Sequence, residues 1–180
     1  SNLQVAFLLD ITGSMGSQIE GVKAMVRAFC MVDRPGVEVT IGTYTEESHG
    51  CYVTLSPVGL AGAALVDYVN RLSLCSPPGI AGVSASGGDG PENVVASITS
   101  LCSRFNEKHN ILSFIVTDAS PHHKSFGNSG EALAEIKYLQ GQQIDDTDIY
   151  HVLDLVVDSL NVTFVPILYN NADRDRWYQQ

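Results

Sequence analysis

The first apolar segment of this chain ends in a group of oxygen-bearing side chains. Residues 5–9 form a continuous apolar run, VAFLL, which is typical of a strand buried on both faces of a sheet. The run stops at Asp10, and Thr12 and Ser14 follow at alternate positions, with Gly13 allowing a tight turn before a helical pattern. In an open parallel sheet, ligands bind beyond the carboxyl ends of the strands. The sequence therefore predicts that Asp10, Thr12 and Ser14 lie in a binding crevice.

Strand-like and helix-like apolar patterns alternate along the rest of the chain. We expect strands over residues 5–9, 37–43, 51–55, 111–116 and 162–168, and helices over 17–30, 62–74, 91–105, 131–139 and 148–160. The short link before residues 51–55 indicates a hairpin, so this strand should lie antiparallel at an edge. The pattern predicts an α/β fold: one domain over residues 1–180, with a doubly wound, mostly parallel sheet covered by helices on both faces.

A second acid, Asp118, follows the apolar strand at residues 111–116 in the same way that Asp10 follows the first strand. If these two strands are neighbours where the strand order reverses, both aspartates enter one crevice. The helix that precedes the second of these strands must begin at the same edge. Asp89, in the Gly- and Ser-rich loop before that helix, should then lie beside the crevice.

Three motifs carry a resemblance to a known family. They are DITGS at residues 10–14, GGDGPE at 87–92 and TDASPH at 117–122. Together they resemble von Willebrand factor type A (vWA) domains with a metal-ion-dependent adhesion site (MIDAS), whose first motif is D-x-S-x-S. The other two motifs resemble the G-G-D-x-P-E and T-D-A-P-P-H of a branch found beside atypical alpha-kinases and in large extracellular matrix proteins.

This resemblance implies a Rossmann-like vWA fold in which Asp10, Thr12 and Ser14 bind a metal from the first loop. It also implies that Asp118 contributes from the third loop, often through water. Asp89 stands where the adhesion pattern has a threonine, and Ser120 replaces a proline. The final helix and strand of the family are missing or only begun in residues 170–180.

The chemistry of the donors agrees with the resemblance. Carboxylate and hydroxyl oxygens are hard ligands that suit Mg²⁺ or Mn²⁺. Neutral hydroxyls also leave charge on the ion uncancelled, so an outside anion can complete its coordination. We therefore expect a metal-dependent binding module that recruits an acidic side chain of a protein partner, and not an enzyme. The alternative is a metal-assisted hydrolase or phosphotransfer enzyme that uses Asp10, Asp89, Asp118 and His122.

Several residues around these motifs have more than one interpretation. Asp89 is predicted to be a metal ligand that holds the ion more firmly and weakens its pull on an acidic partner; alternatively, it only caps the third helix. His122 and Glu92 are expected close behind the ligands, although a loop histidine bonding to nearby backbone is the commoner case. His123 should point away from His122. Glu46 is expected in a solvated turn.

The composition of the chain limits the classes of binding partner and indicates a cellular location. The chain has 20 acidic and 10 basic residues and a net charge of −10, which argues against nucleic acid and anionic membrane surfaces. No apolar run is long enough to span a bilayer, and no leader opens the chain. The four cysteines form no C-x-x-C pair, and Cys30 and Cys102 lie in apolar helix stripes. Free thiols favour a reducing, cytoplasmic location.

Overall fold

The computed structural model describes residues 3–106, 108–123, 129–146, 148–158, 160–169 and 177–178. The strands are β1 (Leu3–Asp10), β2 (Val37–Glu47), β3 (Gly50–Leu55), β4 (Asn110–Thr117) and β5 (Asn161–Leu168). The helices are α1 (Ile19–Cys30), α2 (Gly62–Asn70), α3 (Val94–Arg104), α4 (Gly130–Gly141) and α5 (Ile149–Val157), and a short 3-10 helix, η1 (Gly13–Ser17), precedes α1. Strands and helices therefore occur in the predicted order.

The strands form one sheet in the order β3-β2-β1-β4-β5. β1 is parallel to both β2 and β4, and β5 is parallel to β4, whereas β3 pairs antiparallel with β2 at the edge. This confirms the mixed α/β sheet with one antiparallel edge strand. The strand order reverses between β1 and β4, which is where sheets of this kind bind ligands.

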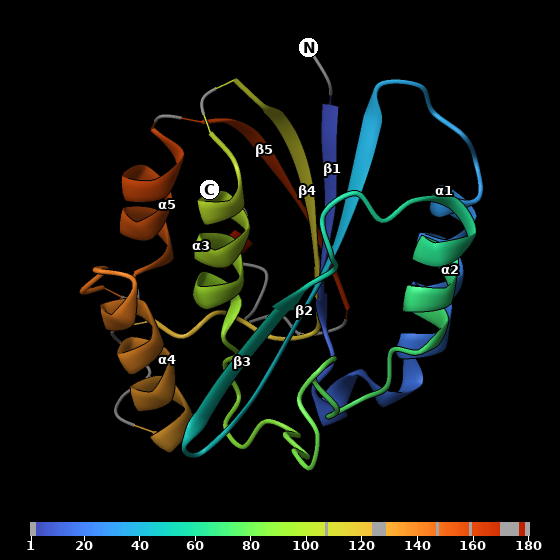
Figure 1. Cartoon of the computed structure of the whole chain (residues 1–180). Coiled ribbons are helices and arrows are strands. Elements are labelled where there is room, and N and C mark those ends of the chain that lie inside the picture. The colour runs from blue at the N-terminus through green and yellow to red at the C-terminus, as the bar shows by residue number, and fades with distance from the viewer. Residues whose placement is uncertain are drawn as a thin grey trace.

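Helices cover both faces of the sheet, with α1 and α2 on one side and α3, α4 and α5 on the other (Figure 1). β1 contributes to both cores because successive strand side chains point to opposite faces. Phe7 and Leu9 pack with apolar residues of α1 and α2. Ala6 and Leu8 pack with apolar residues of α3, α4 and α5. The central strand is thus buried on both faces, as its continuous apolar run predicts.

β2 is longer than expected, and this corrects one prediction. The segment after residue 43 is not a polar turn, because Tyr44, Thr45 and Glu46 continue the strand and are all buried. Tyr44 fills the core on the side of α3 and α4. Pairing with β3 continues as far as Glu47, opposite Gly50. Antiparallel pairing and an aromatic core contact therefore outweigh the polar character of this segment.

The beginning of α3 also differs from the prediction. The helix begins at Val94 with Asn93 as its N-cap, not at residue 91 or 92. Glu92 instead pairs through its backbone with Pro121, in the loop after β4. α2 likewise ends at Asn70, before the predicted residue 74. Apart from residues 177 and 178, the expected incomplete ending over residues 170–180 lies outside the described residues.

Two further expectations concern the whole chain. All four cysteines are free, and Cys30 and Cys102 are buried. Among the described residues, no helix combines the length and apolar character needed to cross a membrane.

Candidate functional site

Asp10 lies at the carboxyl end of β1, held by three hydrogen bonds. Its Oδ1 accepts from the backbone N–H of Thr12 at 2.9 Å and from Thr12 Oγ1 at 2.6 Å. Its Oδ2 accepts from Thr117 Oγ1 at 2.7 Å, across the β1–β4 pair. The side chain of Asp10 is fully buried. These contacts fix the carboxylate at the point where the strand order reverses.

Ser14 and Asp118 complete this group of oxygens. The Ser14 hydroxyl donates to Asp118 Oδ1 at 2.9 Å and lies 3.3 Å from Thr12 Oγ1. The structure thus brings together Asp10, Thr12, Ser14 and Asp118, which we call the oxygen cluster. Asp10 and Thr12 are buried, Asp118 is half-buried and Ser14 is exposed. The oxygen cluster therefore opens to solvent on the side of Ser14.

Burial makes a negative charge on Asp10 unfavourable. It raises the pKa of this carboxyl from 3.8 to about 6, although the hydrogen bonds from Thr12 and Thr117 act in the opposite direction. The neighbouring Asp118 carboxylate adds to the increase. These three hydrogen bonds do not fully offset the cost of burying the charge. A cation beside Asp10 would offset it.

The loop between α2 and α3 is fastened to the ends of β1 and β2. The N–H of Gly13 donates to Ser86 O at 2.9 Å, and the N–H of Gly87 donates to Glu46 O at 2.8 Å. Gly87 has a φ of +80°, and a Cβ there would lie 3.1 Å from Glu92 Oε1 and 3.5 Å from Thr12 Cβ. A glycine is therefore needed where this loop passes over the oxygen cluster.

Glu92 lies close to Thr12 and Asp10 of the oxygen cluster. Its side chain is buried. Burial raises the pKa of Glu92 to about 12, and the nearby Asp10 and Glu46 add to the increase while Thr12 opposes it. Glu92 is thus uncharged at neutral pH and contributes no negative charge beside Asp10.

Asp89 faces a different set of residues. Its Oδ2 lies 3.1 Å from His122 Nε2 and also accepts a hydrogen bond from Ser129 Oγ. Burial raises the pKa of Asp89, but the bonds from His122 and Ser129 and the charge of the imidazole outweigh it, so the pKa is lowered overall. Asp89 is also not the cap of α3, since that position belongs to Asn93. The helix-cap interpretation of Asp89 is therefore wrong.

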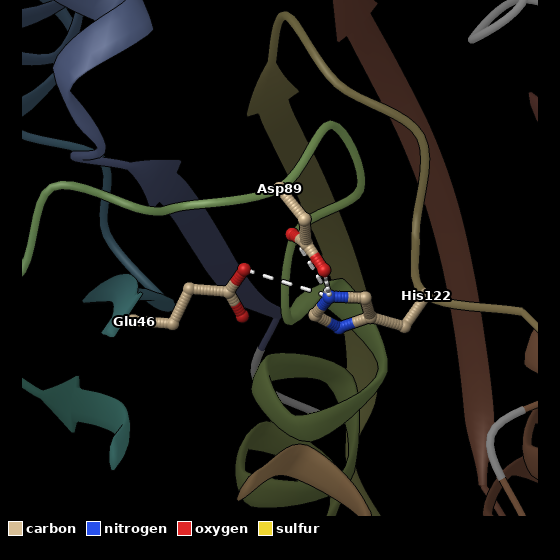
Figure 2. A group of neighbouring side chains, drawn as sticks. All are labelled: Glu46, Asp89 and His122. Carbon is tan, nitrogen blue, oxygen red and sulfur yellow. Dashed lines mark hydrogen bonds and ion pairs between the residues drawn. The ribbon is translucent and has the colours of Figure 1, made fainter. Parts of the chain in front are cut away.

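His122 is at the centre of a second, deeper group. Its Nε2 lies 3.5 Å from Glu46 Oε1, and its Nδ1 lies 3.6 Å from Glu135 Oε1. Figure 2 shows the Nε2 edge of the ring between the carboxylates of Asp89 and Glu46. We call Glu46, Asp89, His122 and Glu135 the buried carboxylate cluster. The His122 ring thus bonds to the Asp89 carboxylate and not to nearby backbone, which is the commoner case for a loop histidine. The expectation of a solvated turn for Glu46 is wrong, because Glu46 lies in β2 and its side chain is 0% exposed.

Local structure explains why these polar groups are buried. Glu46 follows Tyr44 by two residues in β2, so both point to the same covered face. Glu135 lies on the buried stripe of α4, between Ala132 and Leu139. Sequence analysis missed both glutamates. Two signals could have revealed them: Glu46 lies two residues after Tyr44 and so on the same face of the strand, and Glu135 lies within the apolar stripe of its helix.

The loop after β4 is held so that His122 points inward. The N–H of Glu92 donates to Ser120 O at 2.8 Å, and the N–H of His122 donates to Glu92 O at 3.1 Å. His123 points elsewhere, toward Asp148 and the ring of Trp177. The two adjacent histidines therefore diverge, as predicted.

The protonation of the buried carboxylate cluster follows from its crowding. Burial raises the pKa of Glu46 to about 10, with further increases from Glu135 and Asp89. Burial lowers the pKa of His122, but its hydrogen bond to Asp89 and the nearby carboxyl groups of Asp89 and Glu135 raise it to about 10. Burial also raises the pKa of Glu135. Glu46 and Glu135 thus hold their protons more tightly than exposed glutamates, and the imidazole is the positive partner of Asp89, whose pKa is lowered.

Solved structures that share the fold include a thread matrix protein and a pilus adhesin. Proximal thread matrix protein 1 from the mussel byssus is 10% identical with a TM-score of 0.55, and the match covers 94% of this chain and 38% of that one. The pilus adhesin SpaC from Lactobacillus rhamnosus GG is 12% identical with a TM-score of 0.50, covering 99% of this chain and 29% of that one. This chain therefore spans well under half of either protein. No protein-family model and no curated protein matches the sequence.

Proposed function

We propose that this chain is a vWA-like, metal-dependent protein-binding module with a MIDAS-type site. Asp10, Thr12, Ser14 and Asp118 would hold one Mg²⁺ or Mn²⁺ ion at the carboxyl edge of the sheet. The single observation that carries the proposal is the joining of Ser14 to Asp118 across the β1–β4 switch point. Four hard oxygen donors meet there, three from the first of the three motifs and one from the third.

The ion would supply an electrophilic centre for an anionic group of a partner protein. Thr12 and Ser14 donate oxygen without adding negative charge, so the ion would retain attraction for an outside carboxylate. The exposure of Ser14 gives that carboxylate a route to the oxygen cluster. The occurrence of the fold in a pilus adhesin agrees with an adhesive role.

A hydrolase or phosphotransfer enzyme in the same crevice has less support. It would require His122 or Asp89 to act together with Asp10 and Asp118. His122 is only 1% exposed and is surrounded by carboxyl groups, so a substrate at the oxygen cluster would not reach it. Turnover of generic phosphoester or ester substrates by the Mg²⁺-loaded domain would nevertheless favour the enzyme.

Metal titration tests the proposal directly. Calorimetric titration of Mg²⁺ should show one site in the native chain and none in Asp10→Ala. Ser14→Ala should weaken binding, whereas Ser17→Ala should not, because Ser17 lies exposed at the end of the same 3-10 helix. Equal affinity in the native chain and Asp10→Ala would reject the site.

The second half of the test concerns the partner's anion. With Mn²⁺ bound, water-proton relaxation reports water on the ion. Acetate, used as a minimal carboxylate ligand, should displace that water from the native domain. An unchanged relaxation rate at saturating acetate would reject the proposed recruitment of an acidic side chain, even if the metal binds.

A further inference from the structure

The buried carboxylate cluster contains more acid than its single imidazole can pair. Asp89 Oδ2 lies 3.1 Å from His122 Nε2, which makes one ion pair. Glu46 and Glu135 are both fully buried, and all four of their carboxyl oxygens lack a hydrogen-bond partner within the described part of the chain. Buried polar groups are almost always satisfied, so each exception needs an explanation. An ion pair between Asp89 and His122 leaves Glu46 and Glu135 unexplained.

The arrangement of three of these side chains matches that of metal ligands. One ligand atom from each of Glu46, Asp89 and His122 lies within 4.8 Å of the others. His122 Nε2 is 3.1 Å from the nearer Asp89 oxygen and 3.5 Å from Glu46 Oε1. In a tetrahedral zinc site with ligand bonds of about 2.0–2.2 Å, neighbouring ligand atoms lie roughly 3.2–3.6 Å apart. The two distances from His122 Nε2 therefore match those between neighbouring ligand atoms of a tetrahedral zinc site.

Glu135 lies on the far side of the imidazole. Its Oε1 is 3.6 Å from His122 Nδ1, the nitrogen that faces away from Glu46 and Asp89. This separation is longer than a hydrogen bond, so Glu135 would have to move slightly closer to accept Nδ1–H. That bond would fix the ring so that Nε2 presents its lone pair to a metal, which is the usual support for a metal-binding histidine. Orienting the His122 ring for a metal would therefore explain the buried Glu135, which an ion pair between Asp89 and His122 does not explain.

We propose that Glu46, Asp89 and His122 form a second metal site, distinct from the oxygen cluster, with Glu135 as the residue that positions His122. The ligand set of one imidazole nitrogen and carboxylate oxygens is suited to Zn²⁺ or a similar first-row transition ion, and imidazole is a poor ligand for Mg²⁺. A water or a second carboxylate oxygen completes the coordination. Asp89, with its side chain 19% exposed, marks the route of entry.

The experiment is a zinc titration against a chromophoric chelator, using the chelator-stripped chain in the Asp10→Asn background. This background disables the oxygen cluster, so zinc binding that persists belongs to the second site. One zinc ion should bind with the same affinity as in the native chain. Glu46→Gln should weaken binding by roughly 100-fold or more, and Glu135→Gln by about 10- to 100-fold. Glu47→Gln is the matched control, because the neighbouring Glu47 bonds to Tyr52 instead.

Imidazole ¹⁵N NMR identifies the ligand atom. Zinc should shift the Nε2 resonance of His122 and leave its Nδ1 bound to hydrogen, while the other four histidines in the chain stay unchanged. Binding that survives Glu46→Gln, binding that disappears in Asp10→Asn, or the absence of zinc binding would each overturn the proposal. Glu46→Gln keeps the side-chain volume and adds no charge, so the test does not depend on a His122 variant that folds poorly. The result is also independent of Mg²⁺ binding at the oxygen cluster.

Discussion

Asp10→Asn should remove metal binding and at the same time stabilise the metal-free chain. Burial places the pKa of Asp10 at about 6 instead of 3.8. A tenfold change in a protonation equilibrium corresponds to about 1.4 kcal/mol, so an ionised Asp10 at pH 7.5 costs the metal-free fold roughly 3 kcal/mol. Asparagine keeps the size of the side chain and carries no charge.

The gain is partly offset by hydrogen bonding. Asp10 accepts from both Thr12 and Thr117, and the amide nitrogen of asparagine cannot accept from one of them, at a cost of about 1 kcal/mol. The free energy of unfolding should therefore rise by about 2 kcal/mol. For a chain of this length, that corresponds to a melting temperature about 4–8 °C higher.

Calorimetric melts in chelator and in saturating Mg²⁺ test this reasoning at two pH values. Because the folded state holds the Asp10 proton more tightly than the unfolded state, the penalty grows as pH rises from about 4 through 6. The advantage of Asp10→Asn should thus be large at pH 7.5 and small at pH 4.5. Mg²⁺ should stabilise the native chain but not Asp10→Asn. The control variant Asp33→Asn, at an exposed position, should behave like the native chain. A variant that melts at or below the native chain at pH 7.5 in chelator would refute the argument.

Three other outcomes are expected. Gly87→Ala should lose about 1–3 kcal/mol of stability and weaken Mg²⁺ binding, because a φ of +80° strains alanine and the new Cβ would lie 3.1 Å from Glu92 Oε1. Gly90→Ala, where a Cβ would have nothing within 4 Å, should change neither quantity. Thermal melts and Mg²⁺ titrations measure both. In urea unfolding, the free energy of unfolding of the metal-free chain should fall steadily from pH 6.5 to 9. The folded state keeps the protons of Glu46 and His122 up to about pH 10, whereas the unfolded state releases them at lower pH. A flat profile would contradict this, and Glu46→Gln should reduce the slope. Removing bound divalent ions with a chelator should lower the melting temperature more at pH 8 than at pH 5, where a proton already neutralises Asp10 and competes with the ion.

The sequence predicts the oxygen cluster better than the buried carboxylate cluster, for a physical reason. Asp10 and Asp118 each interrupt an apolar strand, and parallel strands end at a common edge, so their meeting follows from topology. Strand pairing confirms that the two strands are neighbours. The oxygen cluster therefore depends on where strands end, which periodicity reveals.

The buried carboxylate cluster depends on which way individual side chains point. Glu46 is buried because β2 extends past its expected end, and strand length was set by pairing with β3. Glu135 is buried because α4 packs against the sheet edge on that side. His122 points inward because of backbone bonds to Glu92. Such orientation depends on contacts distant in sequence, which local patterns do not encode.

The backbone hydrogen bonds between Glu92 and the loop of Ser120 and His122 join the supports of both clusters. Asp118 belongs to the oxygen cluster and His122, four residues later, to the buried carboxylate cluster, so one short loop serves both. If each cluster binds its ion, the two binding equilibria are thermodynamically linked. The factor by which Zn²⁺ changes the affinity for Mg²⁺ must then equal the factor by which Mg²⁺ changes the affinity for Zn²⁺. If that factor differs from one, the partner binding proposed for the oxygen cluster would depend, at a fixed magnesium concentration, on the supply of a different metal.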